Sequence, residues 1–219
     1  MVQYPRTIWV VRHCEREDNI DHNWRKKAEF KKFHHDNSPL SARGKKQADE
    51  LANRFKNVTI NHCFASPFDR TIETAAAIVK GKNLLINPEP GFIEVLYLCE
   101  KPPSYWENSE LKKHYPDVNE NYLPFFTKNT LPKEDFGDEG CIDRVGRTLE
   151  HIFGNYHGDL LFVSHGAAIG AIHANLVNDF LYVGQATVSK FVETQKGVFE
   201  MKTTSDSSHL SDQRNLRPW

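Results

Sequence analysis

TIWVVRH, residues 7–13, consists of five mostly apolar residues that run directly into an arginine and a histidine. A near-continuous apolar run of this length is typical of a strand that is covered on both faces, as in a parallel sheet. Three further short apolar segments follow along the chain, at 62–65, 84–86 and 160–163. We expect each of them to form a strand of the same sheet.

Helical patterns alternate with these strands. The first predicted helix has Ser41 as its N-cap and buries Ala48, Leu51 and Phe55. The second is capped by Asp69 and ends at Gly81. Two further helices are predicted, one over 142–154 and one that begins at Gly166. Strands that alternate with amphipathic helices predict an α/β fold with a mostly parallel sheet. Two alternating segments, 189–194 and 198–203, are expected to add an antiparallel pair.

The composition indicates a single globular domain. The chain has 219 residues, of which 39% are hydrophobic and 26% charged, enough for a sizeable core. We assign residues 1–204 to this domain. Within it, helical periodicity gives way to prolines and aromatic residues at about 97–140, which predicts a long insertion. Residues 205–219 are polar and are expected to form a flexible C-terminal tail.

Charge and cysteine content exclude several classes of protein. The formal net charge of −1 provides no global field for nucleic acid or anionic lipid, so neither is an expected partner. No stretch approaches the roughly 18 apolar residues of a membrane span. Four widely spaced cysteines and an N-terminus without a signal-peptide pattern favour reduced thiols and a cytoplasmic location. A homodimer is left open.

Charged residues follow the predicted strands at the point where each strand ends. Arg12 and His13 end the first strand, Arg70 comes shortly after the second, Glu94 follows the third, and His165 follows the fourth. Ligands of parallel α/β sheets bind beyond the carboxyl ends of the strands. We therefore expect these five side chains to converge at one edge of the sheet, with a further arginine one loop turn away at position 16.

Such a group of side chains is suited to phosphate chemistry. Arginines offer planar, permanently charged forks that match phosphate oxygens. A neutral imidazole can attack phosphorus, and a carboxyl group can protonate the leaving oxygen. Arginines and imidazoles supply the positive charge, so the chemistry requires no metal. Each residue alone is a weak signal, because a single histidine at a strand end is more often structural than catalytic.

Three motifs resemble those of the histidine phosphatase (phosphoglycerate mutase-like) superfamily, in the order of that family. They are RHCE at 12–15, similar to the family's Arg-His-Gly-Glu, ASPFDRTIETA at 65–75, and VSHG at 163–166. Within that superfamily, ERED at 15–18 is similar to the Glu-Arg-x-Asp of the phosphatase domain of the Sts/TULA signalling suppressors and of insect ecdysteroid-phosphate phosphatase. SPLSARG at 38–44 resembles the family's helix entry, and PGFIE at 90–94 resembles the stretch that bears the acid. The resemblance implies a three-layer α/β/α arrangement, with helices on both faces of the sheet and the insertion over the active site.

The resemblance also implies a role for each matching residue. His13 would be the nucleophile that forms a phosphohistidine, and Glu94 would be the proton donor. His165 would take part in catalysis and in phosphate binding, where the other contributors would be Arg12, Arg16, Arg70 and Gly166. Neither a cofactor nor a metal is implied. The expected activity is phosphomonoester hydrolysis.

One departure from the motif leaves an alternative open. Cys14 stands where the family has glycine, and glycine there would permit a positive φ or a close backbone approach. A catalytically impaired module that only binds phosphate is therefore an alternative, although cysteine is small and we expect activity to be retained. A phosphoglycerate mutase is disfavoured, because segment 97–140 has no arginine for a sugar-acid carboxylate and the chain after Glu15 lacks the mutase-like Ser-x-Trp-Asn.

The prediction of substrate class depends on the aromatic residues of the insertion. Aromatic residues of the insertion either line a pocket for an aryl, steroid or phosphotyrosine leaving group or simply bury the insertion against the sheet; they are Tyr97, Trp106, Tyr115, Tyr122, Phe125 and Phe126. The substrate would be a phosphorylated small molecule or a phosphotyrosine protein. The basic run RKKAEFKK, 25–32, is interpreted as an exposed face rather than a nucleic-acid or lipid patch. His34-His35-Asp36 is interpreted as a solvated loop rather than a metal site.

Overall fold

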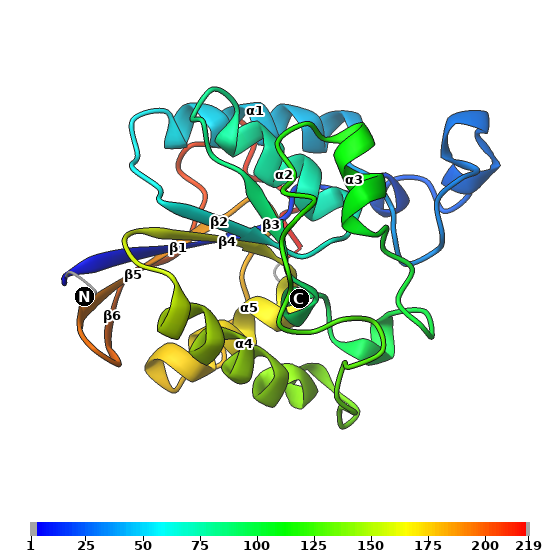
Figure 1. Cartoon of the computed structure of the whole chain (residues 1–219). Helices are drawn as coiled ribbons and strands as arrows, with labels where there is room; N and C mark the ends of the chain where they lie inside the picture. Colours follow the sequence, from blue (N-terminus) through cyan, green and yellow to red (C-terminus); the bar gives the residue numbers. More distant parts are fainter. Residues whose placement is uncertain (1–3, 218–219) are drawn as a thin grey trace.

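The computed structural model describes residues 4–217 and contains one six-stranded sheet. The strands lie in the order β3-β2-β4-β1-β5-β6 (Figure 1). Their bounds are Arg6–Arg12 (β1), His62–Ala65 (β2), Ile86–Pro88 (β3), Leu160–Ser164 (β4), Val188–Gln195 (β5) and Val198–Asp206 (β6). The first four strands are parallel, whereas β5 and β6 run antiparallel. The predicted mostly parallel sheet and its antiparallel pair are confirmed.

Helices cover both faces of this sheet. The α-helices are Ala42–Phe55 (α1), Asp69–Val79 (α2), Asn108–His114 (α3), Ile142–Asn155 (α4) and Gly166–Val177 (α5). In Figure 1, α1 and α2 lie above the sheet, whereas α4 and α5 lie below it. Short 3₁₀ helices, among them Glu17–Asn19 (η1) and Asp138–Cys141 (η6), lie in the connections. None of the helices within residues 4–217 is both long and apolar enough to cross a membrane.

Strand β1 explains why the opening stretch is apolar without interruption. Successive side chains of a strand point to opposite faces, and each face of β1 meets a different helical layer. Ile8 and Val10 belong to the core on the α4–α5 side, whereas Val11 belongs to the core on the α1–α2 side. All three side chains are buried. A strand in this position cannot carry a polar residue on either face without burying it.

The structure confirms the predicted N-cap of α1 but not the predicted N-cap of α2. The Ser41 hydroxyl accepts the Gly44 amide at 2.9 Å and caps α1, as predicted. The predicted Asp69 cap is wrong, because Phe68 occupies the N-cap position of α2. The Asp69 carboxylate instead accepts bonds from Asn37 and Tyr115, at 2.7 and 2.8 Å. The carboxylate oxygens of Asp69 therefore bind residues of distant loops instead of the amides of the first turn of α2.

The third strand begins later than the apolar pattern indicated. The apolar run at 84–86 predicted a strand there, but β3 covers Ile86–Pro88. Leu85 is 48% exposed and contributes little to the core. A short apolar run fixes the existence of a buried strand more reliably than its ends.

The C-terminal segment is packed where we expected a flexible tail. Strand β6 continues to Asp206, past the predicted boundary at 204, and residues 207–217 then lie along the body of the protein. Leu210 is only 4% exposed, and the carbonyl of Leu216 accepts the Gln185 amide at 2.6 Å. Apolar contacts of Leu210 and Leu216 and hydrogen bonds to the segment, such as those from Arg43 to the carbonyls of Asp212 and Arg214, hold it in place. Residues 218 and 219, also part of the predicted tail, lie outside the described residues.

Candidate active site

Two histidines meet where the adjacent strands β1 and β4 end. These strands are parallel with Arg12 opposite Ser164, so the next residue on each strand, His13 and His165, also lie side by side. The amide of His13 donates to the carbonyl of Ser164 at 3.0 Å. The two imidazole rings lie edge to face, with their centroids 5.2 Å apart. The strand register thus brings together two histidines that are 152 residues apart in the sequence.

The imidazole of His13 has a defined tautomer. Its Nδ1 lies 2.7 Å from the carbonyl oxygen of Cys14, which can only accept, so Nδ1 carries the proton and Nε2 carries the lone pair. The residue is 1% exposed. Burial, followed by the positive charges of Arg70 and Arg12, holds the pKa of His13 well below its usual value of 6.5. The ring is therefore neutral at pH 7.

The guanidinium of Arg12 is held by hydrogen bonds from Nη1, whereas its Nε is left without a partner in the described chain. Its Nη1 donates to the carbonyl of Val183 at 2.6 Å and to the carbonyl of Arg217, whereas its buried Nε has no partner within the described chain. Burial lowers the pKa of Arg12 to about 10, so it stays charged at pH 7. A Cβ atom at Gly166 would lie 3.3 Å from Arg12 Cζ, closer than most side-chain contacts. Glycine at the start of α5 therefore leaves room for the guanidinium.

Arg70 approaches the same place from the first turn of α2. Its Nη1 donates to the carbonyl of Asp36 at 2.7 Å, and its guanidinium carbon lies 4.6 Å from the centroid of the Phe68 ring. Burial lowers the pKa of Arg70 to about 10. Its Nε is also buried, with no partner in the part of the chain described. Arg70 thus holds a positive charge that faces His13 and keeps one donor free.

His165 completes the group of buried donors. Its Nε2 lies 2.7 Å from the hydroxyl of Ser66, whereas its buried Nδ1 has no partner among residues 4–217. With the serine hydroxyl donating to Nε2, Nδ1 carries the proton and can donate it to a ligand. Burial, followed by the positive charge of Arg70, keeps the pKa of His165 well below 6.5.

Arg16 differs from the other predicted phosphate-binding residues. Its guanidinium makes two bonds to the carboxylate of Asp18, at 2.8 and 3.0 Å, and its side chain is 30% exposed. Its charge nevertheless contributes to lowering the pKa values of both His13 and Arg12. Arg16 therefore lies at the mouth of the site, and its pairing with Asp18 would have to loosen before it could bind a ligand directly.

Glu94 is attached to the helix that begins beside His165. Its Oε1 accepts the amide of Val95 at 3.1 Å and the amide of Ala167, in the first turn of α5, at 3.2 Å. The amides at a helix N-terminus have no partners within the helix and favour a carboxylate. The loop after β3 and the start of α5 are thereby joined next to the histidine pair.

Arg144 of α4 holds the segment that carries Glu94. Its Nη1 donates to the carbonyls of Gly91 and Ile93, at 2.8 and 3.0 Å, and its Nη2 donates to the carbonyl of Glu94 at 3.2 Å. Its Nε lies 2.5 Å from a carboxylate oxygen of Glu134, in the predicted insertion. Arg144 is completely buried. The backbone around Glu94 is thus fixed by one guanidinium.

Sequence reasoning missed Arg144 and the bond made by Ser66. A signal for Arg144 was available, because it lies three residues after Cys141 and four before Thr148, on the buried stripe of α4. An arginine on such a stripe must have buried partners. The partner of Ser66 is decided by how β2 and β4 pack together, so no local pattern revealed it.

Cys14 is accommodated without strain. Its φ is not in the left-handed region, and its side chain is fully buried in the core on the α1–α2 side. Its amide donates to the Thr74 hydroxyl at 3.2 Å. Burial raises the pKa of the Cys14 thiol to about 12, so the thiol stays protonated and unreactive. Nothing at this position requires glycine.

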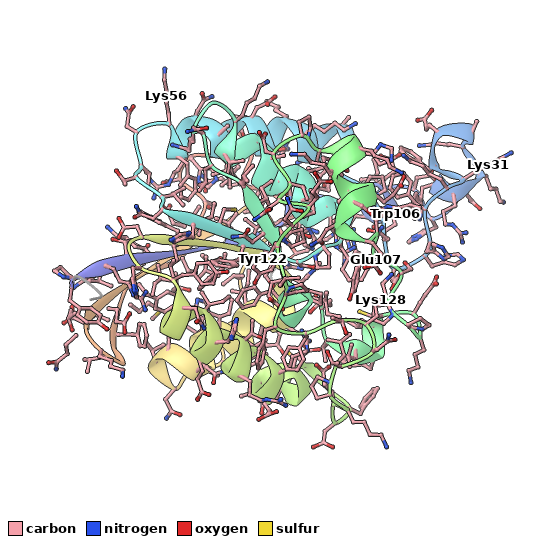
Figure 2. All side chains as sticks on the ribbon, in the orientation of Figure 1. Lys31, Lys56, Trp106, Glu107, Tyr122 and Lys128 are labelled. Atoms are coloured by element: carbon pink, nitrogen blue, oxygen red, sulfur yellow. The ribbon has the colours of Figure 1, made fainter. Side chains whose placement is uncertain are left out.

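Most aromatic residues of the insertion bury the insertion itself. Five of the six predicted rings are buried or half-buried: Trp106, Tyr115, Tyr122, Phe125 and Phe126. Trp106 packs against the core on the α1–α2 side, whereas Tyr122 belongs to the opposite core (Figure 2 labels both). Tyr97 alone among the six is exposed, at 38%. The packing interpretation therefore holds for all but Tyr97.

Tyr97 belongs to an aromatic rim built around Asp138. Its hydroxyl donates to one carboxylate oxygen of Asp138 at 2.6 Å, and the hydroxyl of Tyr182 donates to the other at 2.9 Å. Phe136 packs against Tyr97 with ring centroids 4.7 Å apart and is 89% exposed. Tyr97 follows Glu94 by three residues, and Tyr182 precedes the carbonyl that holds Arg12. We call Tyr97, Phe136 and Tyr182 the aromatic rim.

Fold and site together define an α/β protein whose parallel strands end in buried arginines and imidazoles, an arrangement suited to a phosphate group. The family model described as "Histidine phosphatase superfamily (branch 1)" matches residues 8–207. The chain belongs to the histidine phosphatase superfamily. The fold and the enzyme class expected from the sequence motifs are thereby confirmed.

Known proteins similar to this chain include phosphatases and a mutase. Adenosylcobalamin/alpha-ribazole phosphatase of Escherichia coli K12 is 24% identical over 174 residues, 78% of each chain. The ecdysone phosphate phosphatase from Bombix mori, solved with tungstate, has a TM-score of 0.67 at 19% identity and 90% and 92% coverage of the two chains. A phosphoglycerate mutase from Bacillus anthracis has a TM-score of 0.61 at 21% identity, with 94% and 95% coverage. At these identities the structural similarities establish the fold.

Proposed function

We propose that this protein is a phosphomonoester hydrolase that works through a phosphohistidine on His13. One observation carries the proposal. Three buried N–H groups without partners in the described chain belong to side chains around the neutral imidazole of His13, namely Nε of Arg12, Nε of Arg70 and Nδ1 of His165. A tetrahedral oxyanion is the ligand that satisfies donors arriving from different directions.

In the first step, the lone pair on Nε2 of His13 attacks phosphorus, and the bond from phosphorus to the ester oxygen breaks. The carboxyl group of Glu94 gives its proton to the departing oxygen, which leaves as an alcohol or phenol. The donors of Arg12, Arg70 and His165 stabilise the charge on the non-bridging oxygens. The bond from Nδ1 of His13 to the Cys14 carbonyl supports this assignment, because it keeps the lone pair on Nε2.

In the second step, the carboxylate of Glu94 takes a proton from water, and the water oxygen attacks phosphorus. The nitrogen–phosphorus bond breaks, inorganic phosphate is released, and His13 returns to its neutral form. Both steps need Glu94 at a fixed distance from phosphorus. Its bonds to Val95 and Ala167 support that requirement.

We further propose aryl phosphates, including phosphotyrosine, as the preferred substrates. Tyr97 of the aromatic rim follows Glu94 by three residues, and Tyr182 directly precedes Val183, whose carbonyl anchors Arg12, so these rings would border the leaving group. Rings held by hydrogen bonds to Asp138 are pre-oriented to stack on a planar phenol. A cytoplasmic location is also part of the proposal, and the four free cysteines agree with a reducing compartment.

Phosphate release from p-nitrophenyl phosphate and from 3-phosphoglycerate tests the function and its substrate class together. We expect kcat/KM for the aryl ester to exceed that for 3-phosphoglycerate by at least about tenfold, the value of one good aromatic contact. Conversion of 3-phosphoglycerate to its 2-phospho isomer would be monitored in parallel. Faster turnover of 3-phosphoglycerate, or its isomerisation, would overturn the aryl preference, and a complete lack of turnover would favour the impaired-module alternative.

Replacing Arg144 should weaken proton donation without touching the phosphate. Arg144→Lys keeps a positive charge beside Glu134 but cannot span three carbonyls, so the backbone at Glu94 is released. We expect kcat for phenyl phosphate, which has a poor leaving group, to fall about ten- to hundredfold. For 2,4-dinitrophenyl phosphate, whose leaving group needs little protonation, the rate of the initial dinitrophenol burst, which reports formation of the phosphoenzyme, should fall by less than about threefold.

Arg147→Lys provides the matched control for that experiment. Arg147 lies one turn further along α4, and its side chain is 49% exposed with a 3.7 Å ion pair to Asp143. We expect no change with either ester. Equal losses in the rate of phosphoenzyme formation from both esters in Arg144→Lys would mean that Arg144 supports the fold rather than the position of Glu94.

A further inference from the structure

A hollow with basic walls lies in the loop segment between β1 and α1. This cavity of about 570 Å³ is lined by His22, Asn23, Trp24, Arg25, Lys26, Lys31 and His35. Its lining includes three permanent positive charges and two histidines but no carboxylate. The whole chain carries a formal charge of only −1, so the positive charge is a local feature. We call this cavity the basic hollow.

The cations of the basic hollow are not neutralised by the protein. Arg25, Lys26 and Lys31 form no ion pair within residues 4–217, although neighbouring Lys27 pairs with Glu17 at 2.6 Å and with Asp21 at 3.2 Å. The carboxylates of Glu17 and Asp21 thus pair with a lysine that does not line the hollow. Three cations that share one concave surface repel each other, and an anionic ligand would remove that repulsion.

The basic hollow has its own small aromatic core. Trp24, Phe30 and Phe33 pack together with ring centroids 5.8 to 6.3 Å apart, and Trp24 is only 3% exposed. Arg25 Nε donates to the carbonyl of Phe33 at 2.8 Å, which fixes its guanidinium. The run 25–32 is an exposed face, as predicted from the sequence, but Trp24 and Phe33 on either side of it pack beneath it. The packed rings of Trp24, Phe30 and Phe33 therefore support the backbone that carries the basic side chains.

The basic hollow is joined to the phosphate-binding end of the sheet. His35 lines the hollow, and the carbonyl of the next residue, Asp36, accepts the bond from Arg70 Nη1. The carboxylate of Asp36 accepts the amides of Glu100 and Ser104 at 2.9 and 3.2 Å, so the loop is tied to the insertion. Figure 2 shows Lys31 at the right of the view, the side toward which the carboxyl ends of the parallel strands point in Figure 1. A ligand on Arg70 can thus extend toward the hollow.

We propose that the basic hollow binds acidic residues that flank a phosphotyrosine in a polypeptide substrate, an inference that rests on the proposed function. A single phosphate occupies the site beside His13, whereas an extended peptide advances about 3.3 Å per residue and reaches further along the surface. Carboxylates a few positions from the phosphotyrosine would meet Arg25, Lys26 and Lys31. The hollow then selects among phosphoproteins by local charge.

A polypeptide fits these observations better than a nucleic acid or a membrane. Binding of single-stranded nucleic acid relies on exposed rings for base stacking, but Trp24 and Phe33 are buried in the support. Binding in a membrane interface needs a large apolar face beside the cations, whereas His22, Asn23, Lys26, Lys31 and His35 are polar and exposed. Acidic side chains require only the unpaired cations.

The experiment compares three phosphotyrosyl peptides that differ only in flanking residues. One carries glutamates on the N-terminal side, one on the C-terminal side, and one carries glutamines on both sides. We expect one acidic peptide to exceed the neutral peptide in kcat/KM by about five- to thirtyfold, mostly through KM, with the advantage lost at high salt. Lys26→Gln/Lys31→Gln should remove most of this advantage and leave p-nitrophenyl phosphate turnover unchanged.

The control variant removes the same charge elsewhere. Lys56 and Lys80 end α1 and α2 and are exposed, and Figure 2 shows Lys56 on the opposite side of the molecule from Lys31. Lys56→Gln/Lys80→Gln should keep the peptide preference. Equal kcat/KM values for the acidic and neutral peptides, an equal effect of the control variant, or charge-dependent sedimentation with phosphatidylserine vesicles but no peptide preference would overturn the proposal.

A protein without phosphatase activity can be distinguished from one whose basic hollow does not bind acidic residues. If p-nitrophenyl phosphate is not hydrolysed at all, binding of the same peptides with a non-hydrolysable phosphonate in place of the phosphate can be followed by fluorescence anisotropy. Tighter binding of an acidic peptide, lost in Lys26→Gln/Lys31→Gln, would then still support the basic hollow. Equal binding of all three peptides would overturn it.

Discussion

His13→Ala is expected to lower kcat/KM for p-nitrophenyl phosphate by at least about 10⁴-fold, because it removes the atom that would form the bond to phosphorus. The remaining donors of Arg12, Arg70 and His165 can still bind phosphate, so inhibition by vanadate should persist. Rapid mixing of the natural protein with radiolabelled substrate, followed by alkaline quenching, should trap a phosphoenzyme that acid destroys. The variant should trap none.

A control separates chemistry from folding in that experiment. His157 is exposed, and His157→Ala should leave both turnover and the trapped phosphoenzyme unchanged. His13→Ala removes a buried ring and its bond to the Cys14 carbonyl, so its unfolding temperature should fall, but circular dichroism should show a folded protein at the assay temperature. Residual activity above about one tenth of normal would contradict a nucleophilic His13.

Glu94→Gln is expected to produce the second largest loss of activity. A glutamine oxygen can still accept the amides of Val95 and Ala167, so the loop should keep its place. It cannot donate a proton as a carboxylic acid does, and general acid catalysis contributes about 10²- to 10⁴-fold. We therefore expect a loss of this size in kcat for phenyl phosphate.

The leaving group distinguishes proton donation from other roles of Glu94. With 2,4-dinitrophenyl phosphate, the departing phenolate needs little protonation, so formation of the phosphoenzyme should be nearly normal in Glu94→Gln. Its breakdown should be slow, because the same carboxylate would activate water. A burst of dinitrophenol followed by slow turnover is the expected time course. Equal, uniform losses with both esters would assign Glu94 a merely structural role.

The parts of the fold that depend on local patterns were predictable from the sequence. The apolar run of β1 identifies a strand buried on both faces, and Ser41 marks the start of α1 through its own hydrogen bond. The ends of elements were less predictable. Asp69 looked like a helix cap, but its oxygens are used by Asn37 and Tyr115, which are 32 and 46 residues away.

The candidate site was predictable because of a rule about parallel sheets. Residues that follow neighbouring strands lie at one edge, so His13, Arg70 and His165 could be grouped without coordinates. Arg144 could not be grouped in this way, since it comes from the middle of a helix and acts on a loop 50 residues earlier. The C-terminal segment was also unpredictable, because its polar composition reveals neither the burial of Leu210 nor the hydrogen bonds that distant residues make to its backbone.

Sequence alone determined that an apolar strand ends on Arg12 and His13, and that the same pattern of charge follows other strands. Period and composition are local properties, so they can be read from neighbouring residues. Only the tertiary structure decided which donors stay free, that the Cys14 thiol is buried and inert, and that Arg25, Lys26 and Lys31 surround one hollow. Those facts depend on hydrogen bonds and packing between residues that are distant in the chain. The partner of a buried polar group is decided by which residues the fold places next to it.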